Sequence, residues 1–134
     1  MKTFTDINQS QKLEEILPIE SADMAHFPWS VLKTCEYVVS PLQGSPIEDL
    51  REIYGNQFIL CWSLTALLDV LPVSCDDGQH CLALINPNPN DKTEWLCAYE
   101  DCKGDLIMEC YADNPVDACY EMVLKLYELK MLCI

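Results

Sequence analysis

The chain has 134 residues, half of them hydrophobic, and carries 22 acidic against 8 basic side chains, for a formal net charge of −14. This length is typical of one domain and allows a core to form without disulfides or metals. So acidic a surface repels phosphate backbones and anionic membranes, which argues against direct nucleic-acid binding. We therefore expect a single globular domain over residues 1–134.

The cysteine content indicates a reducing compartment. There are nine cysteines, an odd number, and residues 1–10 contain no apolar run of the kind found in a secretory leader. We expect a cytoplasmic protein whose thiols act as small buried hydrophobes. The most apolar stretch, residues 58–68, is shorter than the roughly 20 residues of a membrane span, so we expect no membrane association.

The first part of the chain predicts a short helix followed by extended structure. Residues 9–17 favour a helix with Ser10 as its N-cap and Pro18 at its end. Residues 24–40 are rich in aromatic and β-branched side chains and favour one or two strands. Pro28 must then lie at a strand start or edge.

Residues 41–46 predict a turn that leads into a second helix. Ser45 is placed to cap this helix and Pro46 to occupy its first position, and Gly55-Asn56 ends it. Four apolar residues share one side of the helix. They are Ile47, Leu50, Ile53 and Tyr54.

Residues 61–72 predict a third helix. Ser63 is its expected N-cap and Pro72 its stop. Its apolar stripe consists of Leu64, Leu67, Leu68 and Leu71. Residues 73–79 predict a turn.

The next segment predicts an antiparallel meander with strands over residues 80–85, 94–101 and 105–111. Residues 86–92, rich in asparagine and proline, form a loop between the first two strands. A two-residue turn at Lys103-Gly104 sets a register. It pairs Cys102 with Asp105, Tyr99 with Met108, and Cys97 with Cys110.

In that register one face of the hairpin is apolar and packs on the core. Its members are Trp95, Cys97, Tyr99, Leu106, Met108 and Cys110. The opposite face carries Glu94, Glu100 and Glu109. Core packing is also the expectation for all three tryptophans, Trp29, Trp62 and Trp95.

The last helix, over residues 114–132, has the clearest start signal. Asn114 caps it, Pro115 occupies its first position, and Asp117 in the first turn suits the helix dipole. The helix is apolar around most of its girth, from Val116 to Cys133. Two alternatives follow: the helix is central to the domain, or its second face meets another subunit.

The motifs that carry metal or nucleophile chemistry are not found. No two cysteines have the two-residue spacing of a zinc knuckle, and adjacent His80 and Cys81 point to opposite faces of a strand. With nine cysteines and only His26 and His80, a cysteine near a histidine discriminates nothing. The four isolated glycines form no phosphate-binding loop. We therefore name no catalytic, cofactor-binding or metal-binding residue and no cofactor.

Three stretches carry a family resemblance. They are residues 9–24, with the Ser21-Ala22-Asp23-Met24 run; Trp62-Ser63-Leu64 through Leu71-Pro72; and Asn114-Pro115-Val116-Asp117-Ala118 through Leu132. In order and spacing they resemble a family of small uncharacterised proteins encoded in Bacteroides and relatives, often among prophage or mobile-element genes. The resemblance implies no activity, cofactor or site residue. The chain differs at Cys61, where relatives often have alanine.

These patterns together predict an α+β fold: an antiparallel sheet of three or more strands with a long C-terminal helix and two or three shorter helices. The leading functional hypothesis is a non-enzymatic protein-binding or accessory protein of a mobile element. Its contact is a protein partner or a second copy, through the C-terminal helix. The alternatives are an enzyme that uses dispersed carboxylates or a cysteine, and an acidic mimic of nucleic acid. A flat apolar patch with an acidic rim favours the binding protein.

Overall fold

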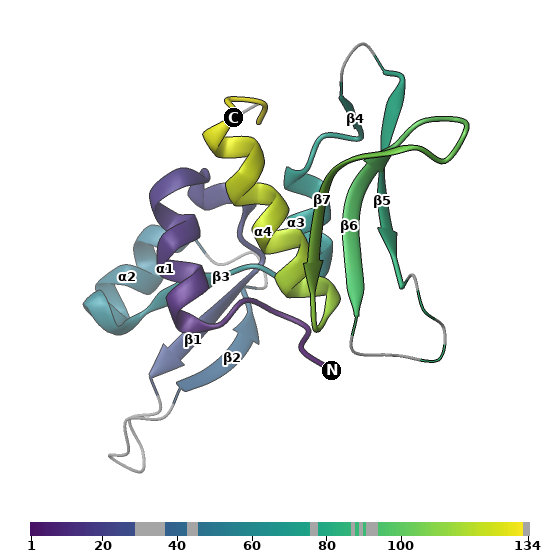
Figure 1. Cartoon of the computed structure of the whole chain (residues 1–134). Coiled ribbons are helices and arrows are strands. Elements are labelled where there is room, and N and C mark those ends of the chain that lie inside the picture. The colour runs from purple at the N-terminus through teal and green to yellow at the C-terminus, as the bar shows by residue number, and fades with distance from the viewer. Residues whose placement is uncertain are drawn as a thin grey trace. The chain divides into compact units, whose positions relative to one another are not determined.

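The computed structural model describes residues 1–28, 37–42, 46–75, 78–86, 88, 90 and 94–132. These residues form four α-helices and two antiparallel sheets, one of three strands and one of four (Figure 1). The predicted α+β class, with a long C-terminal helix and two or three shorter ones, is confirmed, and the described residues contain three shorter α-helices.

The chain divides into two compact units. The N-terminal unit is Thr5–Ser63, and the C-terminal unit combines Met1–Phe4 with Leu64–Ile134. The single domain expected over residues 1–134 stays a prediction. No helix among the described residues is long and apolar enough to cross a membrane.

In the N-terminal unit, helix α1 (Ile7–Ile16) begins earlier than predicted. The Asp6 carboxylate accepts a hydrogen bond from the Gln9 N–H at 2.8 Å, and the Gln9 side-chain oxygen accepts one from the Asp6 N–H at 3.1 Å. This capping box starts the helix at Asp6, so the prediction of Ser10 as N-cap is wrong. The helix ends, as predicted, just before Pro18, and the 3₁₀ turn η1 (Ile19–Ser21) follows.

Ser10 instead belongs to a buried polar network. Its hydroxyl lies 2.8 Å from the Thr5 hydroxyl, which accepts a hydrogen bond from the Trp62 N–H at 3.1 Å. His26 Nε2 lies 3.0 Å from the Thr5 carbonyl oxygen and is therefore the donor. Thr5, Ser10, His26 and Trp62 are at most 5% exposed. The groups satisfy one another, so we assign the network a structural role.

The three-stranded sheet has the order β2-β1-β3, from β1 (Met24–Pro28), β2 (Tyr37–Pro41) and β3 (Ile59–Cys61). Strands at both described ends of residues 24–40 confirm the expected extended structure. Because β3 pairs only with the first three residues of β1, Pro28 lies where β1 has a neighbour on one side.

Strand β3 corrects the third predicted helix, which was expected to include Cys61. Residues 59–61 are at most 7% exposed and hydrogen-bond to β1 instead. The chain leaves β3 at Ser63, whose N–H donates to the Asp23 carboxylate at 2.9 Å and whose hydroxyl donates to it as well. One apolar run therefore divides into a strand and a helix.

Helix α2 (Ile47–Tyr54) forms as predicted and ends at Gly55, whose φ of 63° suits glycine. Pro46 was expected to be the first helical residue, but its backbone is extended and it is the N-cap residue, so the helix begins at Ile47. The 3₁₀ turn η2 (Gly55–Gln57) follows. The predicted apolar side is largely open, since Ile53 is 70% exposed. The Tyr54 ring packs on Phe27, with ring centroids 5.1 Å apart.

In the C-terminal unit, helix α3 (Leu64–Val70) packs against helix α4 (Pro115–Glu128). The start of α4 is as predicted: the Asn114 side chain accepts a hydrogen bond from the Asp117 N–H at 2.9 Å, and Pro115 comes first. The Asp117 carboxylate also pairs with the Lys2 ammonium at 2.8 Å.

The end of α4 comes earlier than the predicted residue 132. Lys130 adopts a φ of 58°, its N–H donates to the Tyr127 carbonyl at 3.0 Å, and the Met131 N–H donates to the Leu126 carbonyl at 2.8 Å. This pair of bonds is a Schellman motif, which ends a helix. The left-handed position is filled by lysine rather than glycine, so the sequence gives no strong stop signal there.

The four-stranded sheet has the order β4-β5-β6-β7. Its strands are β4 (Ser74–Cys75), β5 (His80–Ile85), β6 (Trp95–Glu100) and β7 (Leu106–Ala112). The last three confirm the predicted meander. The short β4 corrects the turn expected over residues 73–79, because Ser74 and Cys75 pair with Cys81 and His80.

The register of the hairpin is only half as predicted. Cys97 does face Cys110, but Tyr99 faces Ile107 rather than Met108. Asp101 and Asp105 close a three-residue turn that ends in Gly104, with a φ of 84°. A bulge at Met108, with a φ of 51°, then restores the predicted register. The two irregularities cancel beyond the bulge.

Some predictions fall on residues outside the described ones. They are the extended structure at Trp29 and Val31, the packing of Trp29, the Ser45 cap, the Cys133 position and residues 87, 89, 91 and 92 of the loop. Within that loop, Asn86 and Asn88 side chains each accept a hydrogen bond, at 3.1 Å, from the N–H two residues on.

Candidate functional site

Two buried thiols, Cys61 and Cys97, have raised pKa values. Cys97 and Cys119 are fully buried, and their mutual hydrogen bond, together with burial, raises the pKa of Cys97 far above its ordinary value. Burial, and then the charge of Asp23, raises the pKa of Cys61 to about 12. At neutral pH the Cys61 and Cys97 thiols stay protonated, and a protonated thiol is a poor nucleophile. Among the described residues, no three His, Cys, Asp or Glu side chains are grouped to hold a metal ion.

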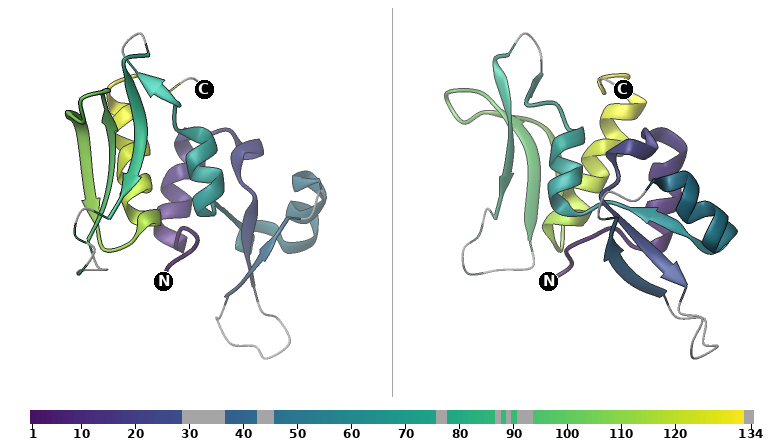
Figure 2. Two further views of the ribbon diagram at one scale, coloured as in Figure 1. Left: turned by 90° about the vertical axis from the view of Figure 1, so that its right-hand side faces the viewer. Right: turned by 180° about the vertical axis from the view of Figure 1, so that it is seen from behind.

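The four-stranded sheet has two faces with different surroundings. On its inner face, Cys97 and Tyr99 of β6 lie toward α4 and α3: Cys97 bonds to Cys119, and the Tyr99 hydroxyl donates to the Pro72 carbonyl at 2.8 Å. We call the opposite side the outer sheet face. No helix of the C-terminal unit lies on that side in the part of the chain the structure describes (Figure 2). Its apolar side chains are Ala83, Ile85, Leu96, Ala98, Leu106 and Tyr111.

The strand register places these side chains together, because residues opposite each other in neighbouring strands point to the same face. Leu96 lies between Ile85 and Tyr111, and Ala98 pairs with Ala83. Leu96 is 2% exposed and forms the floor of the face, whereas Tyr111 is 52% exposed. Tyr111 is thus a large aromatic side chain presented to solvent on an apolar surface.

Three carboxylates stand on the same face, as the sequence predicted. Glu100 of β6, Glu109 of β7 and Glu94, which directly precedes β6, each lie two residues from an outer-face residue, so they alternate onto that side. The Tyr111 hydroxyl donates to Glu109 at 3.4 Å. Partial desolvation, and then the charges of Glu109 and Glu94, raise the pKa of Tyr111. We call these three glutamates the acidic rim.

The hairpin irregularities decide which side chains reach each face. Leu106 and Met108 were expected on the core face, but Ile107 takes the position opposite Tyr99 and Leu106 pairs with Glu100. Leu106 therefore belongs to the outer sheet face, and its assignment to the core face is wrong. The cause is the extra residue in the turn, which shifts the start of β7 by one residue and so reverses its faces.

The composition of the strands is that of a sheet covered on both sides. Residues 81–85 (CLALI) and 95–99 (WLCAY) contain no charged residue and do not alternate apolar with polar. Strands buried on both faces show such continuous apolar runs, while a solvated face gives alternation. Within the C-terminal unit, helices cover one face. Alternation alone assigns only every second residue of the hairpin to the core, so it does not reveal this apolar second face.

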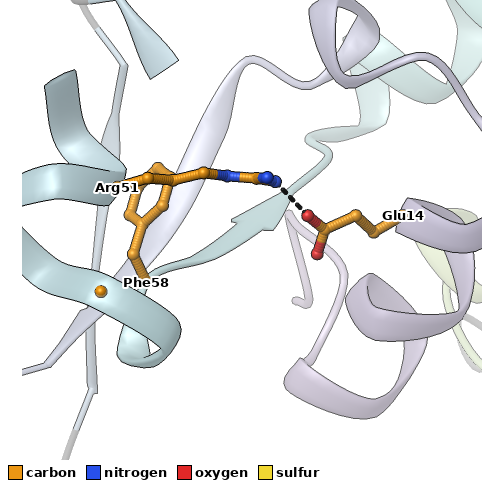
Figure 3. Close-up of a pocket in the computed structure, with 4 residues that line it drawn as sticks. Glu14, Arg51 and Phe58 are labelled. Atoms are coloured by element: carbon orange, nitrogen blue, oxygen red, sulfur yellow. Dashed lines mark hydrogen bonds and ion pairs between the residues drawn. The ribbon is translucent and has the colours of Figure 1, made fainter. Parts of the chain in front are cut away.

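A small pocket lies in the N-terminal unit (Figure 3). It has a volume of about 230 Å³ and is lined by Glu14, Arg51, Gly55 and Phe58. The Arg51 guanidinium extends toward Glu14 and forms an ion pair with it. Because the positive charge is already matched and is 46% exposed, the pocket carries no assignment to a ligand.

The chain matches no protein-family model, no curated protein and no solved structure among those compared with it. The family resemblance stated above stays a prediction. The outer sheet face with its acidic rim is the candidate functional site.

Proposed function

We propose that this chain is a non-enzymatic protein-binding protein that receives a basic protein partner on its outer sheet face. One observation carries the proposal: strands β5 and β6 are apolar toward both sides, and helices of their unit cover one of them. An apolar surface bordered by charged residues is typical of a protein-binding site. The exposed Tyr111 is the residue type that most often anchors such contacts.

Charge determines which partner fits. The acidic rim borders the apolar centre along β6 and β7, and the whole chain carries a net charge of −14. A second copy placed on the same face would oppose two acidic rims, which destabilises the contact. A partner with lysine or arginine around an apolar centre gains from the same charges and is attracted over a longer range.

The sequence supports a cellular compartment and a genetic context for this binding protein. The odd number of cysteines supports a reducing cytoplasm. The resemblance to mobile-element proteins supports an accessory role for such an element. Self-association through the C-terminal helix is the less favoured contact, because seven residues of α4 are already buried and its exposed large apolar side chains, Tyr127 and the C-cap residue Leu129, are confined to its C-terminal end.

Site-specific photocrosslinking tests the proposal. A benzophenone amino acid replaces Tyr111 in one variant and Tyr127 in a matched control, since the two tyrosines are 52% and 46% exposed. We expect one discrete adduct with a basic protein from the Tyr111 variant, expressed in its own host, and none from the control.

Three outcomes count against the proposal. They are no adduct at position 111, equal adducts at both positions, and an adduct with a second copy of the chain. The last of these assigns the outer sheet face to a homodimer instead.

A further inference from the structure

We infer that the occupant of the outer sheet face is a single cationic amphipathic helix, which rests on the proposed function that this face receives a protein. The inference concerns the size, secondary structure and charge of the contacting segment. It follows from the dimensions of the sheet, from what covers its inner face and from the acidic rim.

The dimensions of the face fit one helix. The six residues of β5 span about 20 Å, and the three strands β5 to β7 are spaced over about 10 Å. A helix is about 10 Å wide, and about 14 residues of it span 21 Å. One such helix covers the apolar side chains from Ala83 to Tyr111, while a second one has no room beside it.

The inner face provides the precedent within the same molecule. There α4, a helix of 14 residues, packs on β6 and β7. On the outer face, Ala83 of β5 and Ala98 of β6 are small residues that lie between the row Ile85–Leu96–Tyr111 and the row Cys81–Glu100–Leu106. Small residues along the middle of a sheet allow a helix to approach it closely. A helix added there completes a three-layer helix–sheet–helix arrangement.

The acidic rim sets the charge of that helix. Glu94 and Glu109 lie beside Tyr111 at one part of the face, and Glu100 lies beside Leu106 at another. Lysines or arginines that flank the apolar stripe of a bound helix reach these carboxylates. Each such pair contributes little, so the rim selects the partner by charge while the apolar contact supplies affinity.

Two synthetic peptides of about 16 residues test the inference. Both carry leucine on one helical face, flanked by lysine in one peptide and by glutamate in the other. Binding is measured by fluorescence anisotropy, and helix formation by circular dichroism. We expect the lysine peptide to bind and to become helical on binding, and the glutamate peptide to bind at least about tenfold more weakly.

Two triple variants separate the acidic rim from the general acidity of the chain. Glu94→Gln/Glu100→Gln/Glu109→Gln neutralises the rim, and Glu48→Gln/Asp49→Asn/Glu52→Gln neutralises three exposed groups of α2. Both change the net charge by the same amount. We expect the rim variant to bind the lysine peptide about tenfold more weakly than the wild type does, and the α2 variant to bind it less than about twofold more weakly.

A second pair of variants tests the apolar contact. We expect Tyr111→Asn to weaken binding of the lysine peptide about tenfold. The matched control is Tyr127→Asn, since Tyr127 is a tyrosine of similar exposure, and we expect it to leave the affinity unchanged. Thermal unfolding of each variant verifies that the fold is intact.

Equal weakening by the two triple variants, or no binding of either peptide, overturns the inference. If a discrete adduct still forms at Tyr111, the proposed protein-binding function stands and only the helical, cationic partner is excluded. If neither adduct nor peptide binding is found, both proposals fail.

Discussion

The inner and outer faces of one sheet both carry apolar side chains along β5 and β6, but they differ in what lies on them. Cys97 and Tyr99 on the inner face of β6 are fully buried against helices of their own unit. Leu96 and Ala98, their neighbours in sequence, point the other way and are 2% and 0% exposed, although no described helix of their unit lies on that side. The comparison teaches that an apolar strand does not by itself show which face is the core. The covering layer distinguishes a structural face from a binding face.

The largest expected contrast is between the two tyrosines of the hairpin. Tyr99 is fully buried and its hydroxyl bonds to the Pro72 carbonyl, so Tyr99→Ala is expected to lower the free energy of unfolding by about 3–5 kcal/mol. Tyr111→Ala is expected to change it by less than about 1 kcal/mol. Urea denaturation under reducing conditions measures both. Equal losses would show that the outer face is as much a part of the core as the inner one.

The thiols give a second contrast. Cys81 on β5 is exposed at the outer side of the sheet, and Cys97 on β6 is fully buried. We expect iodoacetamide to modify Cys81 in the native protein at least about a hundredfold faster than Cys97, which becomes accessible only on opening. Peptide mapping by mass spectrometry follows each site. Comparable rates would contradict the assignment of the two faces.

A smaller effect appears in the pH dependence of stability. The hydrogen bond to Cys119 and burial raise the pKa of Cys97 in the folded state, whereas an unfolded thiol titrates near 9.0. A raised folded-state pKa stabilises the protein below the unfolded value, and this stabilisation is lost as pH rises above it. We expect the difference in unfolding free energy between the wild type and Cys97→Ala to shrink above about pH 9. A difference that stays constant or grows up to pH 10.5 would refute this.

The smallest effect concerns the acidic rim. The Glu109 carboxylate helps to raise the pKa of Tyr111, so Glu109→Gln is expected to lower that pKa toward its ordinary value. Phenolate absorbance during an alkaline titration reports the change. The matched control is Glu128→Gln, which neutralises an exposed glutamate on α4 and is expected to leave the titration of Tyr111 unchanged.

Local signals predicted the elements whose ends are determined by neighbouring residues. Asn114 and Pro115 start α4, Gly55 ends α2, and the strands of the meander follow their side-chain patterns. Prediction failed where a distant or unusual partner decides the outcome. Strand β3 forms because β1 lies beside it, and Lys130 takes a left-handed conformation that usually belongs to glycine.

The candidate site was foreseen only in part. The charged residues of the outer face, Glu94, Glu100 and Glu109, were placed correctly from alternation alone. Leu106 was assigned to the wrong face because one extra turn residue and the Met108 bulge change the register locally. The apolar residues between the glutamates, Leu96 and Ala98, are assigned to the outer sheet face only once α4 is known to cover the other side.

Methyl NMR with a neutral soluble paramagnetic agent tests most directly whether the outer sheet face is uncovered in the free chain. We predict strong relaxation enhancement of the Ala83, Ile85 and Leu106 methyls and none at Val123 and Leu126 of α4, which are fully buried. When a partner binds, the relaxation enhancement of the outer-face methyls is predicted to fall to that of the Val123 and Leu126 methyls. Outer methyls as protected as Val123 and Leu126 in the free monomer would contradict the account, because the chain would then cover this face by itself.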